Sequence, residues 1–174
     1  MPVRDVDTFV RPRSGLRWFG NRGASGIDGV VSSAGGVAST GAPTTLYIGD
    51  LALLHDIGGL LAAVHHGVDM NIVVASNGGG SIFSFLPVAA QHPDAGGPSD
   101  EEFRTLFTTP HSRPLVEVAG GCGAGHLVCA TETDLAAALT DHPNGVRILE
   151  VPVDADRNLE QHRRIAAAIS DALR

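Results

Sequence analysis

The chain has 174 residues, 43% of them hydrophobic and 18% charged, which is enough for one compact domain and excludes collagen-like, low-complexity and disordered classes. Its formal net charge of −7 argues against a nucleic-acid surface. Because no apolar stretch reaches the ~18 residues that cross a bilayer and the N-terminus is too charged for a signal peptide, we expect a cytoplasmic protein without a membrane span.

Apolar periodicity predicts alternating strands and helices from the N-terminal part of the chain onward. A short apolar run at 16–20 is expected to form a strand, and the small and apolar residues of 25–40 are expected to form a closely packed helix. A βαβ unit follows, with strands at 44–50 and 71–76 on either side of a helical pattern at 51–67. The strands of this unit are apolar, as is typical of strands that are buried on both faces.

The alternation continues to the end of the chain. We expect a strand at 126–130, a helix with an N-terminal capping box at 131–141, a strand at 146–153 and a final helix at 159–173. Apolar strands separated by helices predict an α/β fold, a three-layer sandwich whose mainly parallel sheet is covered on both faces. The segment 81–103 is rich in proline and glycine, so it is expected to form a loop or lid at the edge where such sheets bind ligands.

Three glycine-bearing segments, 20–29, 48–52 and 76–83, directly follow predicted strands. Asp50 and Asn77 close two successive strands of the βαβ unit, so their side chains should project toward one point at the edge of the sheet. With a carbonyl from the glycine run they would form an all-oxygen partial shell, which suits Mg²⁺ that also binds a phosphate. The sequence contains no lysine, so an anionic ligand would be held by arginine, backbone N–H groups or a metal.

Each of these features also has a simpler interpretation. Asp50 could serve only as a helix N-cap, and the glycines 78–80 could form only a flexible turn. The segment 20–29 has a loose GxxGxxG pattern, but no acidic residue follows about 20 positions on to hold a ribose, so a dinucleotide site is weakly indicated. No GxSxG motif of a serine hydrolase occurs. Cys122 and Cys129 have neither the spacing of a zinc site nor that of a disulfide framework.

The combination of motifs resembles a family of thiamin diphosphate enzymes. Gly49, Asp50 and Asn77 match the GDG…N motif that holds the metal in these enzymes, with Leu51 in place of the third motif residue. The segments GNRGASGIDG, GDL and NGGGSIFSFLP together resemble the 2-succinyl-5-enolpyruvyl-6-hydroxy-3-cyclohexene-1-carboxylate (SEPHCHC) synthases of menaquinone biosynthesis, the MenD family. The similarity covers nearly the whole chain and is most specific at 20–87.

The resemblance implies a role for each matching residue. The ligands of Mg²⁺ (or Mn²⁺) would be Asp50, Asn77 and the backbone oxygen of Gly79. The residues expected to contact thiamin diphosphate are Ser25, Gly26, Ile27, Gly49, Leu51, Ala52, Gly78, Gly79, Ser81 and Ile82. Ile27 matches the apolar residue that bends the cofactor into a V shape. The residues expected to bind substrate are Arg4, Arg22, Ile82, Phe83 and Leu86. Arg4 would meet a substrate carboxylate, and its alternative role is a solvated surface charge.

The resemblance also implies that residues 1–174 are the C-terminal part of a longer, homo-oligomeric enzyme. In such enzymes the cofactor lies between this domain and the pyrimidine-binding domain of a second subunit, which supplies an activating glutamate. None of the six glutamates of this chain has the expected setting, so we assign no catalytic residue and expect the isolated chain to be inactive. The family's reaction decarboxylates 2-oxoglutarate and adds the product carbanion to isochorismate.

Two other functions remain open from the sequence. The chain could belong to another thiamin diphosphate-dependent 2-oxoacid decarboxylase or carboligase, which would share the metal site without needing the arginines. It could also be an assembly or regulatory domain that binds no cofactor. A further expectation is an apolar surface around Ile27 and Phe83 that favours self-association.

Overall fold

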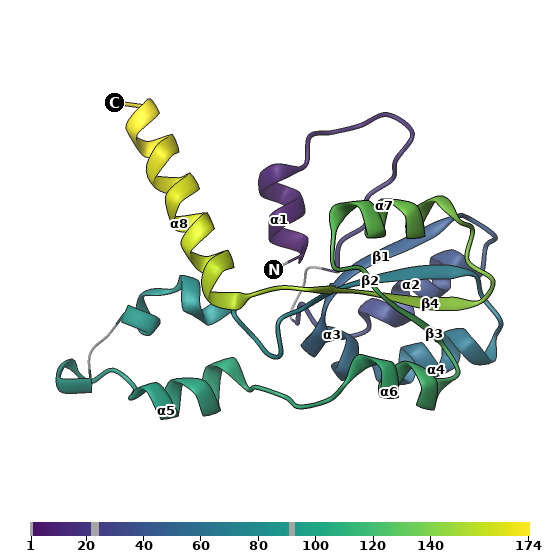
Figure 1. The fold of residues 1–174 in the computed structure, drawn as a ribbon, viewed down its shortest axis with the longest axis horizontal. Coiled ribbons are helices and arrows are strands. Elements are labelled where there is room, and N and C mark those ends of the chain that lie inside the picture. The colour runs from purple at the N-terminus through teal and green to yellow at the C-terminus, as the bar shows by residue number, and fades with distance from the viewer. Residues whose placement is uncertain (1, 22–24, 91–92) are drawn as a thin grey trace. The chain divides into compact units, whose positions relative to one another are not determined.

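The computed structural model describes residues 2–21, 25–90 and 93–174 of the chain. They belong to two compact units. The first, called the sheet unit, comprises Met1–Ser76 and Ser112–Pro152, and the second, called the loop unit, comprises Asn77–His111 and Val153–Arg174. Figure 1 shows the course of the chain through the elements of both units. Among the described residues, no helix combines the length and the apolar character needed to span a membrane.

A parallel sheet forms the centre of the sheet unit. Its strands are β1 (Thr44–Gly49), β2 (Met70–Ser76), β3 (Gly125–Val128) and β4 (Val146–Pro152). Within the described residues they pair in the order β1-β2-β4-β3, and every neighbouring pair is parallel. The two inner strands, β2 and β4, are the most buried, because helices cover both of their faces. The predicted α/β fold with a parallel sheet is confirmed.

One face of the sheet is covered by α2 (Val30–Ala38), α3 (Asp50–His55), α4 (Ile57–His65) and α6 (Leu115–Cys122). Val31, Leu53 and Leu60 from these helices form a single hydrophobic cluster with Ile72 and Ile148 of the inner strands. All five side chains are fully buried, and each such burial stabilises the fold by about 1.5–3 kcal/mol. This cluster is the main core of the protein.

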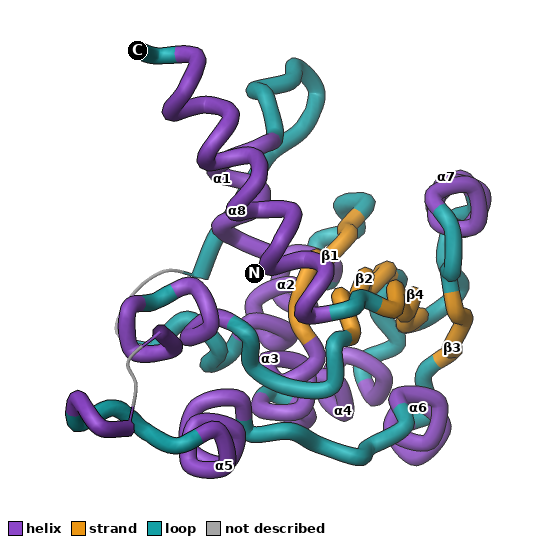
Figure 2. The backbone as a smooth tube through the Cα atoms, turned by 60° about the vertical axis from the view of Figure 1, so that its left-hand side comes forward, coloured by secondary structure: helices purple, strands orange, loops and turns teal. Residues whose placement is uncertain are grey.

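The opposite face of the sheet carries a smaller cluster under α7 (Glu132–Thr140), in which Ala138 packs with Val73 and Leu149. Figure 2 shows the strands between α7 and the helices of the first face. The predicted capping box of α7 is confirmed, since Thr131 and Asp134 each accept a hydrogen bond from the other's backbone N–H. On the same face, burial and the charge of Asp5 raise the pKa of Tyr47.

The loop unit consists of short turns followed by a longer helix. Its elements are η1 (Ile82–Phe85), η2 (Pro87–Ala90), η3 (Pro93–Ala95), α5 (Asp100–Phe103), η4 (Arg104–Thr108) and α8 (Ala155–Ala172). Aromatic contacts connect them: the ring centroids of Phe83 and Phe107 are 5.3 Å apart, and those of Phe85 and His162 are 5.2 Å apart. The segment expected to form a loop or lid is therefore a series of 3₁₀ and α-helical turns.

The predicted strand at 16–20 is wrong. These residues have no regular secondary structure, and the side chain of Phe19 is 72% exposed. An apolar run forms a buried strand only where a neighbouring strand and a helix cover it, and neither covers this run in the described structure. The segment 20–29 consequently does not follow a strand, although the segments after β1 and β2 do.

Several helix boundaries also differ from the expectations. The helix expected at 25–40 is limited to α2, and the pattern at 51–67 is divided at Asp56 into α3 and α4. The final helix starts four residues earlier than expected, because Asp154 caps it by accepting a hydrogen bond from the N–H of Arg157. Two further helices, α1 (Pro2–Phe9) and α6, were not assigned from the apolar periodicity. In α6, two adjacent glycines obscure the helical pattern.

Candidate functional site

The turn between β1 and α3 carries the first group of predicted site residues, Gly49, Asp50, Leu51 and Ala52. Asp50 is the first residue of α3, and only 2% of its surface is exposed. Its carboxylate Oδ1 accepts a hydrogen bond from the N–H of Leu51 at 2.7 Å. Gly49 occupies the N-cap position, so the simple interpretation of Asp50 as the N-cap is wrong. Asp50 is therefore a buried carboxylate at the carboxyl end of a strand, which makes it a candidate ligand for a cation.

Parallel pairing places the ends of β1 and β2 at the same edge of the sheet. Gly49 is the register partner of Ala75, so β1 ends beside the last residues of β2. Asp50 directly follows β1, and Asn77 directly follows Ser76, the last residue of β2. The sequence prediction that a carboxylate and an amide come at the carboxyl ends of neighbouring strands is therefore confirmed.

The side chain of Asn77 is oriented by its own turn. Its amide Nδ2 donates a hydrogen bond to the Ser81 hydroxyl at 2.8 Å. Because the nitrogen is directed at Ser81, the amide oxygen points in another direction and is the atom suited to a hard cation. Ser81, which was predicted only as a residue near the cofactor, thus has a definite structural role.

The glycine run after Asn77 is held in one conformation by hydrogen bonds. Gly78 has a φ of 74°, which favours glycine. The N–H of Gly80 donates to the carbonyl oxygen of Thr108 at 2.7 Å, and the N–H of His111 donates to the carbonyl oxygen of Gly78 at 3.1 Å. A Cβ on Gly79 would lie 2.8 Å from the Thr108 oxygen, so a side chain does not fit there. The run is therefore more than a flexible turn.

The segment that contains Ser25, Gly26 and Ile27 precedes α2 and is exposed, with Ile27 41% exposed. The amide nitrogen of Asn21 donates a hydrogen bond to the carbonyl oxygen of Gly29 at 3.1 Å and to the Ser33 hydroxyl at 3.0 Å. Asn21 is therefore joined to the start of α2, which follows the segment.

The residues predicted to bind substrate differ in where they lie. Ile82 and Phe83 share the 3₁₀ turn η1, and Leu86 follows it; all three side chains are exposed. Arg4 is an exposed residue of α1. Arg22 lies outside the described residues. Of the residues predicted to bind substrate, the structure therefore places Ile82, Phe83 and Leu86 in and beside one turn.

Sequence reasoning missed a group of side chains at the junction of α3 and α4. His55 Nδ1 lies 3.2 Å from the Asp28 carboxylate, which belongs to the segment before α2. Asp56 accepts two hydrogen bonds from Ser32 of α2. The two adjacent glycines at 58–59, within an otherwise helical pattern, were a signal that the helix is interrupted here.

The donor chemistry of the predicted metal ligands is entirely oxygen. No group of three or more His, Cys, Asp or Glu side chains that could hold a metal occurs in the part of the chain that the structure describes. A metal at the predicted site would therefore be held by carboxylate, amide and backbone oxygens of the chain. A bound phosphate would supply further oxygen ligands. Such a set suits Mg²⁺ or Mn²⁺ and does not suit a structural zinc ion.

Burial raises the pKa of Cys122 and Cys129, as expected of unreactive thiols.

Comparison with known proteins identifies the class of this domain. Residues 3–151 match the family described as thiamine pyrophosphate enzyme, C-terminal TPP binding domain. The chain belongs to this family. The cofactor prediction is thereby confirmed at the level of a thiamin diphosphate-binding domain.

The resemblance to SEPHCHC synthases is also confirmed. The chain is 42% identical over 177 residues to the 2-succinyl-5-enolpyruvyl-6-hydroxy-3-cyclohexene-1-carboxylate synthase of Chloroflexus aurantiacus and 41% identical over 176 residues to that of Myxococcus xanthus. Each similarity covers 99% of this chain and 29% of the relative. The synthase of Thermobifida fusca is 41% identical over 180 residues, which cover 31% of its length. This chain therefore spans less than a third of the relatives that it matches.

Solved structures show the same fold at low sequence identity. Benzoylformate decarboxylase from Polynucleobacter necessarius superposes with a TM-score of 0.61 at 19% identity, over 76% of this chain and 24% of that protein. The thiamine diphosphate-dependent 4-hydroxybenzoylformate decarboxylase of Rhodococcus jostii RHA1 gives a TM-score of 0.54 at 20% identity, over 70% and 22%. These similarities support the fold and do not define the substrate.

Proposed function

We propose that residues 1–174 form the diphosphate- and Mg²⁺-binding domain of a SEPHCHC synthase, which decarboxylates 2-oxoglutarate and adds the product to isochorismate. The observation that carries the proposal is a buried carboxylate, Asp50, at the carboxyl end of β1 in a chain that is 42% identical to such a synthase. The homologous synthases are larger, so this domain would provide one part of the whole site.

Asp50, Asn77 and the backbone oxygen of Gly79 would hold the metal ion. All three donors are oxygen atoms, as Mg²⁺ prefers. The close contact of Gly79 with the Thr108 carbonyl oxygen, which leaves no room for a Cβ, would hold the Gly79 backbone in place. The single charge of Asp50 leaves a divalent cation with net positive charge, which would neutralise part of the charge of a diphosphate. The hydrogen bond from Asn77 to Ser81 keeps the amide oxygen directed away from the Ser81 hydroxyl.

The remaining predicted residues would bind and orient the cofactor. Backbone groups of Ser25, Gly26, Gly49 and Gly78, with the residues Leu51, Ala52 and Ser81, would contact thiamin diphosphate. Ile27 and Ile82 are exposed apolar side chains, and Ile27 would support the bent cofactor. When bound, thiamin diphosphate supplies the electron sink that allows a 2-oxoacid to lose CO₂.

The residues proposed to bind substrate would act in two ways, by pairing with its charges and by excluding water. Arg4 and Arg22 would pair with substrate carboxylates, for which a planar guanidinium is well suited. Phe83 and Leu86, both exposed, would be covered by substrate or by a partner domain and would exclude water from the reacting carbon. The pyrimidine-binding domain of a second subunit would supply the activating glutamate, so the chain alone would be inactive.

Calorimetry tests the cofactor part of this proposal. The purified protein is titrated with thiamin diphosphate in the presence of Mg²⁺, together with Asp50→Asn and the control Asp171→Asn, whose side chain is exposed on α8. We expect the control to bind like the unaltered protein and Asp50→Asn to bind at least about tenfold more weakly, because a charged ligand of the metal is lost. No heat at millimolar ligand would contradict the proposal and favour a cofactor-free assembly domain.

An activity assay tests the substrate and partner parts. We expect no turnover of 2-oxoglutarate by the purified chain, and turnover once a pyrimidine-binding domain is added. Measurable turnover by the chain alone would contradict the proposed division of the site. In the reconstituted enzyme, Arg22→Ala should abolish addition to isochorismate; equal loss of simple 2-oxoacid decarboxylation would contradict a specific carboxylate contact.

A further inference from the structure

The junction between α3 and α4 carries a carboxylate that does not serve its own helix. Asp56 occupies the N-cap position of α4, but its side chain makes no capping hydrogen bond there. Its carboxylate instead accepts a hydrogen bond from the backbone N–H of Ser32 at 2.8 Å and another from the Ser32 hydroxyl at 3.0 Å. Ser32 lies in the first turn of α2, where N–H groups have no acceptor within the helix. Asp56 therefore caps α2 from a different element.

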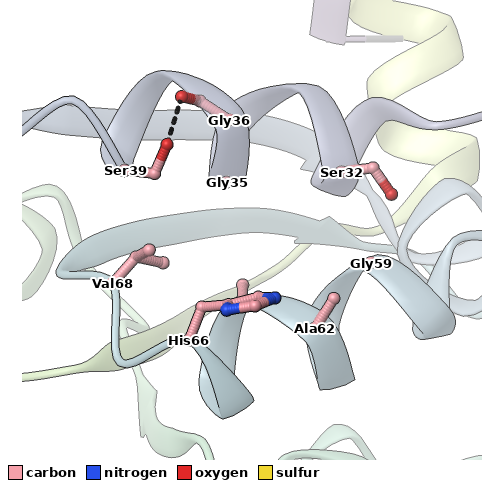
Figure 3. Close-up of a pocket in the computed structure, with 9 residues that line it drawn as sticks. Ser32, Gly35, Gly36, Ser39, Gly59, Ala62, His66 and Val68 are labelled. Carbon is pink, nitrogen blue, oxygen red and sulfur yellow. Dashed lines mark hydrogen bonds between the residues drawn. The ribbon is translucent and has the colours of Figure 1, made fainter.

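Gly59 is the third member of this arrangement, which we call the Ser32–Asp56–Gly59 clasp. A Cβ on Gly59 would lie 2.5 Å from the Ser32 hydroxyl oxygen, 2.7 Å from the Ser32 backbone nitrogen and 2.8 Å from the Asp56 carboxylate. Any side chain at this position would displace the hydrogen-bonded atoms themselves. In Figure 3, Ser32 on α2 and Gly59 on α4 lie at the same end of the groove between the two helices.

The clasp connects two parts of the proposed cofactor pocket within the sheet unit. Residues 25–29, which include Ile27, lead directly into α2, whereas Asp56 directly follows α3, whose first residue is Asp50. A second contact joins the same two segments, because the Asp28 carboxylate lies 3.2 Å from His55. Residues 28 and 32, on either side of the start of α2, are thus joined to residues 55 and 56 at the end of α3.

We infer that Asp56 is a positioning residue of the cofactor pocket: by capping α2 it fixes the segment 25–29 relative to Asp50. The inference rests on the proposed function, because that function gives Ile27 and Asp50 their roles. A carboxylate is favoured at this position both by its hydrogen bonds and by the dipole of α2. Asp56 touches neither cofactor nor substrate in this account, and it acts through the backbone of α2.

Hydrogen exchange of the purified protein tests the clasp directly. In Asp56→Ala we expect the amide of Ser32, and amides in 25–33, to exchange about tenfold faster, the scale expected for a lost helix cap. Gly59→Ala keeps both polar groups and should cause the same loss of protection. Gly58→Ala is the matched control, since a Cβ there meets open space, and it should leave this exchange unchanged.

Affinity for thiamin diphosphate in the presence of Mg²⁺ tests the positioning role. Calorimetry is done at a temperature at which every variant is folded, so that a merely structural role would leave the affinity unchanged. We expect Asp56→Ala and Gly59→Ala to bind about tenfold more weakly, the scale of a lost helix cap. Asp56→Asn keeps one acceptor oxygen and should fall between Asp56→Ala and the unaltered protein. Gly58→Ala should bind normally.

The outcomes separate this inference from the proposed function. Unchanged exchange at Ser32 in Asp56→Ala would overturn the clasp. Unchanged affinity in Asp56→Ala, while the unaltered protein binds thiamin diphosphate, would overturn the positioning role and leave the proposed function intact. Absence of binding by the unaltered protein would overturn the proposed function, and the positioning role with it, whatever the exchange at Ser32 shows.

Discussion

The sheet unit and the loop unit are held together in different ways. Every buried hydrophobic side chain of the described residues lies in the sheet unit, including Leu53 of α3 and Ile148 of β4. In the described part of the loop unit, Gly79 is the one residue classed as buried, and hydrogen bonds and aromatic contacts connect its turns. A region with few buried apolar contacts opens at a lower free-energy cost than a packed core. Asp50 therefore stands on a packed core, whereas Asn77 begins a segment with few buried apolar contacts.

The largest effect on stability is expected from a substitution in the core of the sheet unit. Ile148→Ala removes a fully buried side chain from the inner strand β4 and should lower the free energy of unfolding by about 2–5 kcal/mol. Leu106→Ala in the loop unit removes a side chain that is 68% exposed and should change it by less than about 0.5 kcal/mol. Urea denaturation measures the free energy of unfolding of both variants. Equal losses from the two variants would contradict the contrast.

A somewhat smaller effect is expected at Arg147, which joins the sheet to α7. Arg147 donates from Nε to the Asn71 side chain at 3.0 Å and from Nη2 to the carbonyl oxygens of Ala138 and Asp141. Arg147→Met should lower the free energy of unfolding by about 1.5–3 kcal/mol, since hydrogen bonds of a charged group are lost. Arg164→Met, at an exposed position of α8, is the control, and an equal effect there would refute this role for Arg147.

Substitution of Gly79 should affect binding more than stability. A Cβ 2.8 Å from the Thr108 carbonyl oxygen must displace the glycine run, which we propose carries a metal ligand. In Gly79→Ala we expect about tenfold weaker binding of thiamin diphosphate with Mg²⁺, roughly the value of one lost charge-assisted contact. The melting temperature of the sheet unit should not change. Gly36→Ala, where a Cβ meets open space, should leave binding unaltered; normal binding in Gly79→Ala would count against the metal site.

The smallest effects are expected from removal of the two capping boxes, one in the sheet unit and one in the loop unit. Thr131→Ala should lower the free energy of unfolding by about 1 kcal/mol, whereas Ser99→Ala should increase exchange only locally, in α5. Hydrogen bonds from the Ser99 N–H and hydroxyl lower the pKa of Glu102 below its ordinary value of 4.5. The stability that this gives α5 is present above pH 4.5 and is lost as the pH falls through the lowered value. Exchange in α5 that shows no such pH dependence would disprove this cap.

Periodicity predicted the parallel sheet well because its strands are continuous apolar runs. The three strands β1, β2 and β4 lie within a residue or two of their expected limits, and the capping box of α7 was readable from Thr131 and Asp134. The positions of Asp50 and Asn77 after successive strands followed from the same pattern. These features depend on local sequence, which is why they could be predicted.

The features that could not be predicted from the sequence depend on contacts between residues that are distant in the chain. The run at 16–20 is as apolar as a strand, but only a neighbouring strand could make it one. Asp56 caps α2 across 24 residues of sequence, and no local pattern at either residue indicates that partnership. The same applies to the Thr108 carbonyl oxygen, which holds the glycine run from a distant turn.

One measurement tests the central claim most directly: a crystal of the protein grown with thiamin diphosphate and Mn²⁺, with the metal located by its anomalous scattering. We expect one metal peak at about 2.1 Å from an oxygen of Asp50, from the amide oxygen of Asn77 and from the carbonyl oxygen of Gly79, with cofactor phosphate oxygens completing the shell. A bound cofactor whose metal contacts neither Asp50 nor Asn77 would contradict the account.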